Sequence, residues 1–173
     1  LQVQLAANVT ANSSTGAIMI TSPGGVGVLS TIVPAVISGQ SLSIYEGAAA
    51  AADYTLTTNV SVFTAENLAS NVTIRNSKSL TVGAGPTTTY GSTLAIATTA
   101  GDLSVTGAIT AAATNAADIT LSAAGNVTIG TGGGGAVQAL NRTIAIVAGG
   151  AVQVTSLLDA TGTNGLVDVQ AGT

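Results

Sequence analysis

The chain has 173 residues, of which only 6% are charged and 2% aromatic, with three basic residues against seven acidic ones. So few cations cannot form the basic patch that neutralises nucleic-acid phosphates, nor a basic helix that lies on a membrane surface. Cysteine is absent, which excludes disulfides and thiolate metal sites, and no apolar stretch approaches the about 18 residues of a membrane-spanning helix.

Short triplets of the form apolar–x–apolar run along the chain, with Gly, Asn, Asp and Ser between them. Because side chains alternate across a strand, each triplet predicts a short strand with two inward residues and one outward residue. In chain order the triplets are Ile18–Ile20, Val26–Val28, Leu42–Ile44, Tyr54–Leu56, Val60–Val62, Val72–Ile74, Leu80–Val82, Leu94–Ile96, Leu103–Val105, Ile119–Leu121, Val127–Ile129, Ile144–Ile146, Val152–Val154 and Val167–Val169.

The triplets recur at a nearly constant spacing. One series begins at Ile18, Leu42, Val72, Leu94, Ile119, Ile144 and Val167, with intervals of 24, 30, 22, 25, 25 and 23 residues. A second series begins at Leu80, Leu103, Val127 and Val152, and a weaker third strand fits near Ile109, Val137 and Leu157. A period of this length predicts a parallel β-solenoid, in which neighbouring coils bury each other's apolar faces. We therefore expect one all-β domain over residues 1–173, with three short strands per coil of about 24 residues and about seven coils.

Asn or Asp stands just before many strands, at Asn8, Asn59, Asn71, Asp102, Asp118 and Asn126. These residue types tolerate left-handed backbone and bond to nearby backbone, so they predict corners between faces.

Three segments interrupt the period of the repeat. Gly47–Asp53 is interpreted as an insertion in the 30-residue coil, Pro86–Tyr90 as a loop and Gly132–Gly135 as a flexible turn, while residues 1–17 fit the period least well.

Two phrases, Ala100-Gly101-Asp102-Leu103-Ser104-Val105 and Ala124-Gly125-Asn126-Val127-Thr128-Ile129, resemble the repeats of filamentous-haemagglutinin-type proteins. Those are long secreted bacterial adhesins with relatives among the autotransporters. The resemblance covers residues 70–173 clearly and residues 18–69 loosely. It implies a right-handed β-helix shaft and an extracellular or cell-surface location, with host glycans or cell surfaces as partners.

The sequence predicts no catalytic, cofactor or metal site. Asp102 and Asp118 are interpreted as turn residues, and His is absent, which excludes a Ser-His-Asp triad of the usual form. Glu66, Arg75 and Lys78 form the one concentrated charge cluster, interpreted as a solvated turn or as a contact site on the shaft.

Two alternative functions remain beside a structural shaft. A carbohydrate-active β-helix enzyme would need carboxylates that converge on one face. An ice- or surface-binding solenoid would need a regular outward Thr array, but the outward positions vary, as in Thr120, Ala95 and Gln153. Among the tyrosines, Tyr54 begins a predicted strand, so Tyr90 is the expected exposed sugar contact.

Both ends of the chain read as strands rather than caps. Uncapped solenoid ends template further pairing, so we expect the ends to stack on other copies or on adjacent coils of a longer chain, of which this is an excised or mature segment. The expected stacking residues are Leu1, Val3, Leu5, Leu166, Val167 and Val169.

Overall fold

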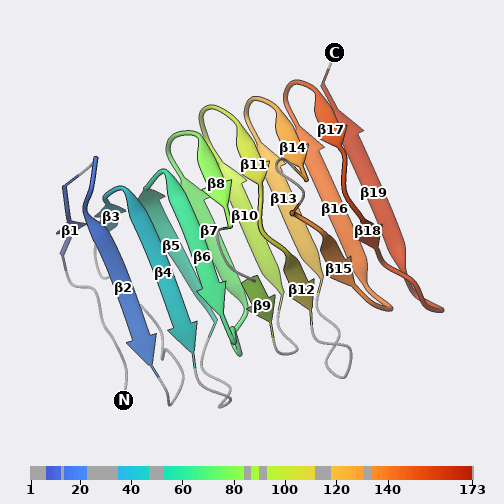
Figure 1. Cartoon of the computed structure of the whole chain (residues 1–173), viewed down its shortest axis with the longest axis horizontal. Helices are drawn as coiled ribbons and strands as arrows, with labels where there is room; N and C mark the ends of the chain where they lie inside the picture. Colours follow the sequence, from blue (N-terminus) through green and yellow to red (C-terminus); the bar gives the residue numbers. More distant parts are fainter. Residues whose placement is uncertain are drawn as a thin grey trace.

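The chain folds into three parallel β-sheets, which wind around one core. This computed structural model describes residues 7–12, 14–22, 35–46, 53–83, 87–89, 93–111, 118–130 and 134–172, and within them it contains no helix. All strand pairs among these residues are parallel and join successive coils, so the chain is a β-solenoid. The coils follow one another along the long axis of the molecule, from the N-terminal to the C-terminal end (Figure 1).

The strands of each sheet follow chain order along this axis. Sheet A comprises β1 (Val9–Thr10), β3 (Val36–Ser38), β5 (Tyr54–Asn59), β7 (Val72–Asn76), β10 (Leu94–Thr98), β13 (Ile119–Ala123), β16 (Thr143–Ala148) and β19 (Leu166–Ala171). Sheet B comprises β2 (Ala17–Ser22), β4 (Ser41–Glu46), β6 (Val62–Glu66), β8 (Leu80–Val82), β11 (Leu103–Val105), β14 (Val127–Ile129) and β17 (Val152–Val154). Sheet C comprises β9 (Thr87–Thr89), β12 (Ile109–Ala111), β15 (Val137–Ala139) and β18 (Leu158–Asp159).

The predicted repeat is confirmed in the C-terminal half. Equivalent residues pair in register, so that sheet A carries the column Val72, Leu94, Ile119, Ile144 and Val167. Sheet B carries the second predicted series, Leu80, Leu103, Val127 and Val152. In sheet C the column runs Ile109, Val137 and Leu158, one residue later than predicted at its last member.

The first half of the chain differs from the prediction. Ile18 and Leu42 lie in sheet B, whereas Val72 lies in sheet A, so the expected 30-residue coil does not exist. In the described residues, four coils have a strand in all three sheets, and the earlier coils have strands in only two. The expected number of about seven coils with three strands each was therefore too high. The same apolar alternation serves every face, and spacing therefore cannot say which sheet a strand joins.

Some strand boundaries also differ from the prediction. The triplet Val60–Val62 is not a strand, because β6 begins at Val62 and points Phe63 and Ala65 inward, while Val60 is buried before the strand. Residues 87–89, predicted as part of a loop, form β9 and pair with β12. The predicted insertion lies outside the described residues except for Asp53, and of the predicted glycine turn only Gly134 and Gly135 are described.

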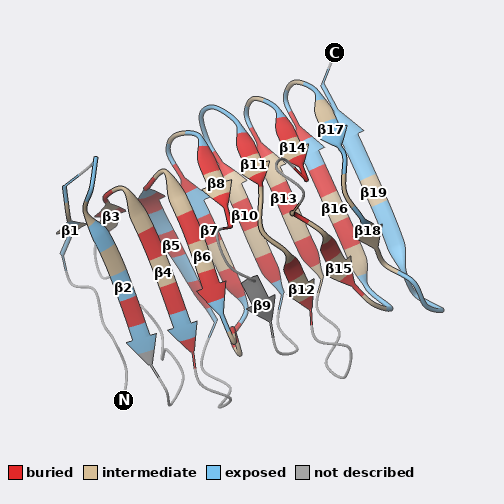
Figure 2. Cartoon of the chain, viewed as in Figure 1, coloured by how far each residue is buried: buried red, intermediate tan, exposed pale blue. Residues whose placement is uncertain are grey.

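The core is a set of stacked columns of Leu, Ile, Val and Ala. Strands such as β8, β11 and β14 bury their first and third residues and leave the middle one partly exposed, as the triplets predict. Figure 2 shows this alternation of buried and more exposed residues along the central strands, whereas β19 is exposed over most of its length. Phe63 is fully buried between Leu42 and Val82, at the step from two-sheet to three-sheet coils.

The corner from sheet A to sheet B packs without space for side chains at some positions. A Cβ on Gly149 would overlap the backbone oxygen of Ala124 in the preceding coil. At the equivalent corner three coils earlier, the side chain of Asn76 is buried and both ends of its amide form hydrogen bonds. Its Oδ1 accepts from the Val60 N–H at 2.9 Å and the Thr58 hydroxyl at 2.8 Å, while its Nδ2 donates to the carbonyls of Val60 and Lys78.

Candidate functional site

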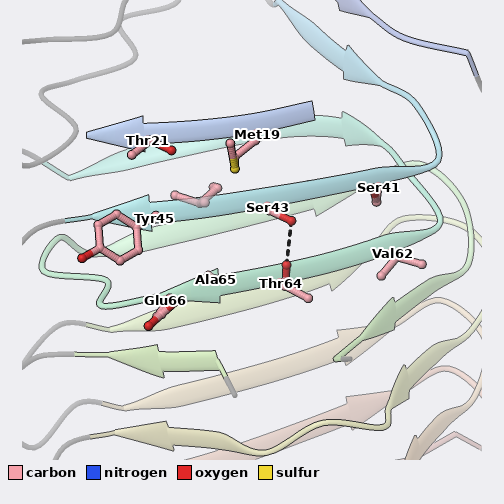
Figure 3. Close-up of a pocket in the computed structure, with 10 residues that line it drawn as sticks. Met19, Thr21, Ser41, Ser43, Tyr45, Val62, Thr64, Ala65 and Glu66 are labelled. Atoms are coloured by element: carbon pink, nitrogen blue, oxygen red, sulfur yellow. Dashed lines mark hydrogen bonds between the residues drawn. The ribbon is translucent and has the colours of Figure 1, made fainter. Parts of the chain in front are cut away.

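The outer face of β2, β4 and β6 forms a groove of about 580 Å³ (Figure 3). Strand register arranges its outward side chains in columns that cross the three strands. One column runs Thr21, Tyr45 and Glu66, and the next runs Met19, Ser43 and Thr64. The third places Ser41 beside Val62. This volume falls within the about 300–1,000 Å³ typical of small-ligand sites.

The groove combines apolar surface with hydrogen-bonding groups. Met19 is 77% exposed and Tyr45 is 37% exposed, so both residues can contact a ligand. Ser43 and Thr64 share a hydrogen bond between their hydroxyl oxygens, 2.8 Å apart. In Figure 3, Tyr45 and Glu66 lie at the same end of the groove, with the Ser43–Thr64 pair near its middle. The site is thus an aromatic ring beside a carboxylate and a pair of hydroxyls.

Sequence reasoning missed Tyr45 as the exposed tyrosine. The predicted strand ended at Ile44, but β4 continues to Glu46, and alternation then turns Tyr45 outward. Tyr54 is buried, as its place in a strand predicts, and Tyr90 lies outside the described residues. The extension of this strand was not predicted because continuing the alternation turns the charged residue Glu46 inward. A buried charge is rare unless hydrogen bonds compensate it.

Glu46 is fully buried behind the end of the groove. Its Oε2 accepts hydrogen bonds from the backbone N–H groups of Ala69 at 2.7 Å and Ser70 at 3.2 Å. Within the described residues, Oε1 of Glu46 and the hydroxyls of Tyr54 and Ser70 are buried without a hydrogen-bond partner. Burial raises the pKa of Tyr54 far above its usual value, and the nearby Glu46 carboxylate raises it further.

Asn71, Asp102, Asp118 and Asn126 stand at corners just before strands, as predicted, but their hydrogen bonds differ from the prediction. Their side chains bond to the next coil rather than locally: Oδ1 of Asp102 accepts from the Asn126 N–H at 2.7 Å, and Oδ1 of Asn126 accepts from the Ala151 N–H at 2.8 Å. A second ladder includes Asn71, which accepts from the Thr93 N–H, and Asp118, which accepts from the Thr143 N–H. Asn71, Asp102 and Asn126 do not use the left-handed backbone that their residue types tolerate.

The predicted stacking residues are described only at the C-terminal end. Val167 and Val169 continue the core columns of Ile144 and Ile146, and Leu166 pairs with Thr143. All three are exposed, between 40% and 55%. Leu1, Val3 and Leu5 lie outside the described residues.

The remaining charged residues are dispersed. Arg75 lies in register with Thr57 and Ala97 in sheet A, whereas Glu66 lies beside Tyr45 in sheet B, so the predicted charge cluster is divided between two sheets. Asp159 accepts a hydrogen bond from the Thr161 N–H at 3.1 Å. That bond, with smaller contributions from the side chains of Thr161 and Gln138, lowers the pKa of Asp159.

Within the part of the chain that the structure describes, no three His, Cys, Asp or Glu side chains gather into a group suited to a metal ion. Over the same residues, no helix has the length and apolarity to cross a membrane. Comparison with known proteins finds no matching family model, no similar curated protein and no similar solved structure.

Proposed function

We propose that this chain is a segment of the structural shaft of an extracellular bacterial adhesin or cell-surface filament, and that its coil is right-handed. The observation that carries the proposal is the in-register parallel stacking of eight strands in sheet A. Parallel strands linked by a crossover within one sheet are right-handed in about 98% of cases, which supports the handedness.

Stacking of this kind makes a stiff rod. The backbone hydrogen bonds between coils run along the rod axis, and each coil adds about 4.8 Å of length. Side-chain columns such as Ile119 on Ile144 bury the core continuously. The ladder through Asp102 and Asn126 adds further bonds between coils at an exposed corner. Length and stiffness then scale with the number of coils, which suits a spacer that carries a binding region away from a cell.

The C-terminal coil is suited to stacking. Val167 and Val169 stand where the next members of two core columns are expected, with one side packed and the other exposed. A further coil, from the same chain or from a second copy, would bury them and pair the outer edge of β19. A heterologous contact of this kind does not close, so it extends into a fibre.

Electron microscopy tests this proposal. Native cell-surface material, labelled on intact cells, is compared with the isolated 173-residue segment and with two variants of β19. Val167→Asp places a charge in a core column, whereas Gln170→Asp changes an outward residue of the same strand, in register with Val147. We expect fibres on intact cells and, if the segment assembles alone, fibres that Val167→Asp shortens and Gln170→Asp leaves intact.

Two results would overturn the proposal. Native material that is globular or intracellular excludes a surface shaft. Fibres that are unchanged by Val167→Asp exclude stacking through the end of sheet A. If only the native material is fibrous, the segment is one stretch of a longer covalent shaft, and the binding region for host glycans or cell surfaces is to be sought elsewhere in that chain.

A further inference from the structure

We propose that the groove on the outer face of β2, β4 and β6 binds a segment of a neutral oligosaccharide or polysaccharide. The proposal does not depend on a shaft function, because it rests on the groove alone. A saccharide presents a C–H face and a rim of hydroxyls, so its site needs an apolar platform with hydrogen-bonding groups around it. The groove offers both within one surface.

Tyr45 and Met19 supply the apolar platform. The Tyr45 side chain is partly exposed at one end of the groove, and Met19 on the neighbouring strand is the most exposed of the large apolar side chains described (Figure 3). Aromatic side chains favour such sites because the ring face packs on apolar groups while the hydroxyl stays wet. Met adapts its shape to the ligand beside it.

The polar groups of the groove lie beside the apolar platform. Glu66 is the direct cross-strand neighbour of Tyr45, and its carboxylate accepts strong hydrogen bonds from hydroxyl donors. Ser43 and Thr64, whose hydroxyls lie 2.8 Å apart, retain lone pairs for a ligand beyond the bond that they share. A row of acceptors therefore runs beside the apolar platform.

Charge selects a neutral sugar over an acidic one. Among the described residues that line the groove, Glu66 is the only charged side chain, and the whole chain has a net charge of −4. A uronate, sulfate or phosphate group would be repelled there. Glycosidases use a pair of carboxylates, so a groove with this single acid is assigned to binding rather than cleavage.

The groove belongs to the first coils because their sheet B strands are longer. β2, β4 and β6 have five or six residues, whereas β8, β11, β14 and β17 have three. The columns that contain Ser43 and Tyr45 have members only in the long strands. The later coils turn instead into sheet C, so this surface is not repeated along the rod.

Calorimetric titration with defined oligosaccharides tests the proposal. The neutral probes are cellohexaose, xylohexaose, mannohexaose and maltohexaose, and the acidic probe is a galacturonate oligomer of similar length. We expect at least one neutral probe to bind with a Kd of about millimolar or tighter, and the acidic probe to bind more weakly. Tyr45→Ala should weaken neutral binding about tenfold or more, whereas Tyr45→Phe, which keeps the ring, should retain it.

Glu66→Gln tests the two roles of the carboxylate separately. It should weaken the binding of the neutral oligosaccharides, and it should reduce the difference in Kd between the neutral and the acidic probes. The matched control is Thr128→Ala, an outward residue of β14 outside the groove, which should bind as the unmodified protein does. The proposal is overturned if none of the neutral probes binds at millimolar concentration, if Tyr45→Ala binds normally, or if the acidic probe binds more tightly than all neutral ones.

Discussion

Asp102 accepts the backbone N–H of Asn126 through Oδ1 at 2.7 Å, across the step from one coil to the next. Asn126 in turn accepts the N–H of Ala151, so the side chains continue the backbone ladder around a corner where no sheet exists. An acceptor of this kind satisfies a donor that the strand pairing leaves unused. The ladder links coils along the axis of the rod.

Replacing Asp102 tests this link. Asp102→Ala removes the acceptor for the Asn126 N–H and should lower the free energy of unfolding by about 1 kcal/mol. Asp102→Asn retains an Oδ1 acceptor and should lose less. Chemical denaturation of both variants measures the difference. Asp168→Ala removes a half-buried acid of β19 that lies outside the ladder and serves as the control. Equal losses in the two Ala variants would contradict a role for the ladder.

Inward and outward neighbours on β13 should respond very differently to truncation. Ile119 is fully buried between Leu94 and Ile144, so Ile119→Ala should cost about 2–5 kcal/mol of stability. Thr120, the next residue, faces outward, and Thr120→Ala should cost less than about 1 kcal/mol. Urea unfolding followed by circular dichroism compares the two. Similar losses would mean that β13 has a different register.

Gly149 should not tolerate a side chain. Its Cβ would meet the backbone oxygen of Ala124, which can move only if the two coils separate. We expect Gly149→Ala to destabilise the chain by about 1–3 kcal/mol, measured by thermal unfolding. Ala124→Ser changes an exposed residue of the same corner and should leave the melting temperature nearly unchanged. A Gly149→Ala variant with unchanged stability would show that the two coils pack less closely at this corner than described.

Tyr54 predicts a loss of stability at alkaline pH. Its pKa is raised in the folded state. The contribution of Tyr54 to the free energy of unfolding is therefore fully present below the unfolded pKa of about 10, and it declines as pH rises above that value. The decline is about 1.4 kcal/mol per pH unit, because the unfolded state releases a proton that the folded state keeps. Denaturation of the unmodified protein and Tyr54→Phe is compared from pH 8 upward.

Tyr54→Phe should differ little in stability from the unmodified protein near neutral pH, because the hydroxyl that it removes lies close to the Glu46 carboxylate but forms no hydrogen bond of standard geometry among the described residues. Above the tyrosine pKa the variant should become the more stable of the two. Stability curves that stay parallel across this range would mean that Tyr54 ionises in the folded chain.

The sequence by itself determined the class of fold and the inward and outward sides of most strands. Apolar–x–apolar triplets at a period near 24 residues require coils that bury one another, and the columns through Leu94 and Leu103 follow that period. This part was predictable because strand alternation is a local property.

Only the tertiary structure decided which sheet each strand joins. Leu42 and Val72 carry the same local pattern yet lie in different sheets, because parallel pairing is set by contacts between coils rather than by the strand itself. The same contacts extend β4 to Glu46, which turns Tyr45 outward beside Glu66 and creates the groove. An inward carboxylate is acceptable there because the backbone N–H groups of Ala69 and Ser70, more than 20 residues away in the chain, bond to it.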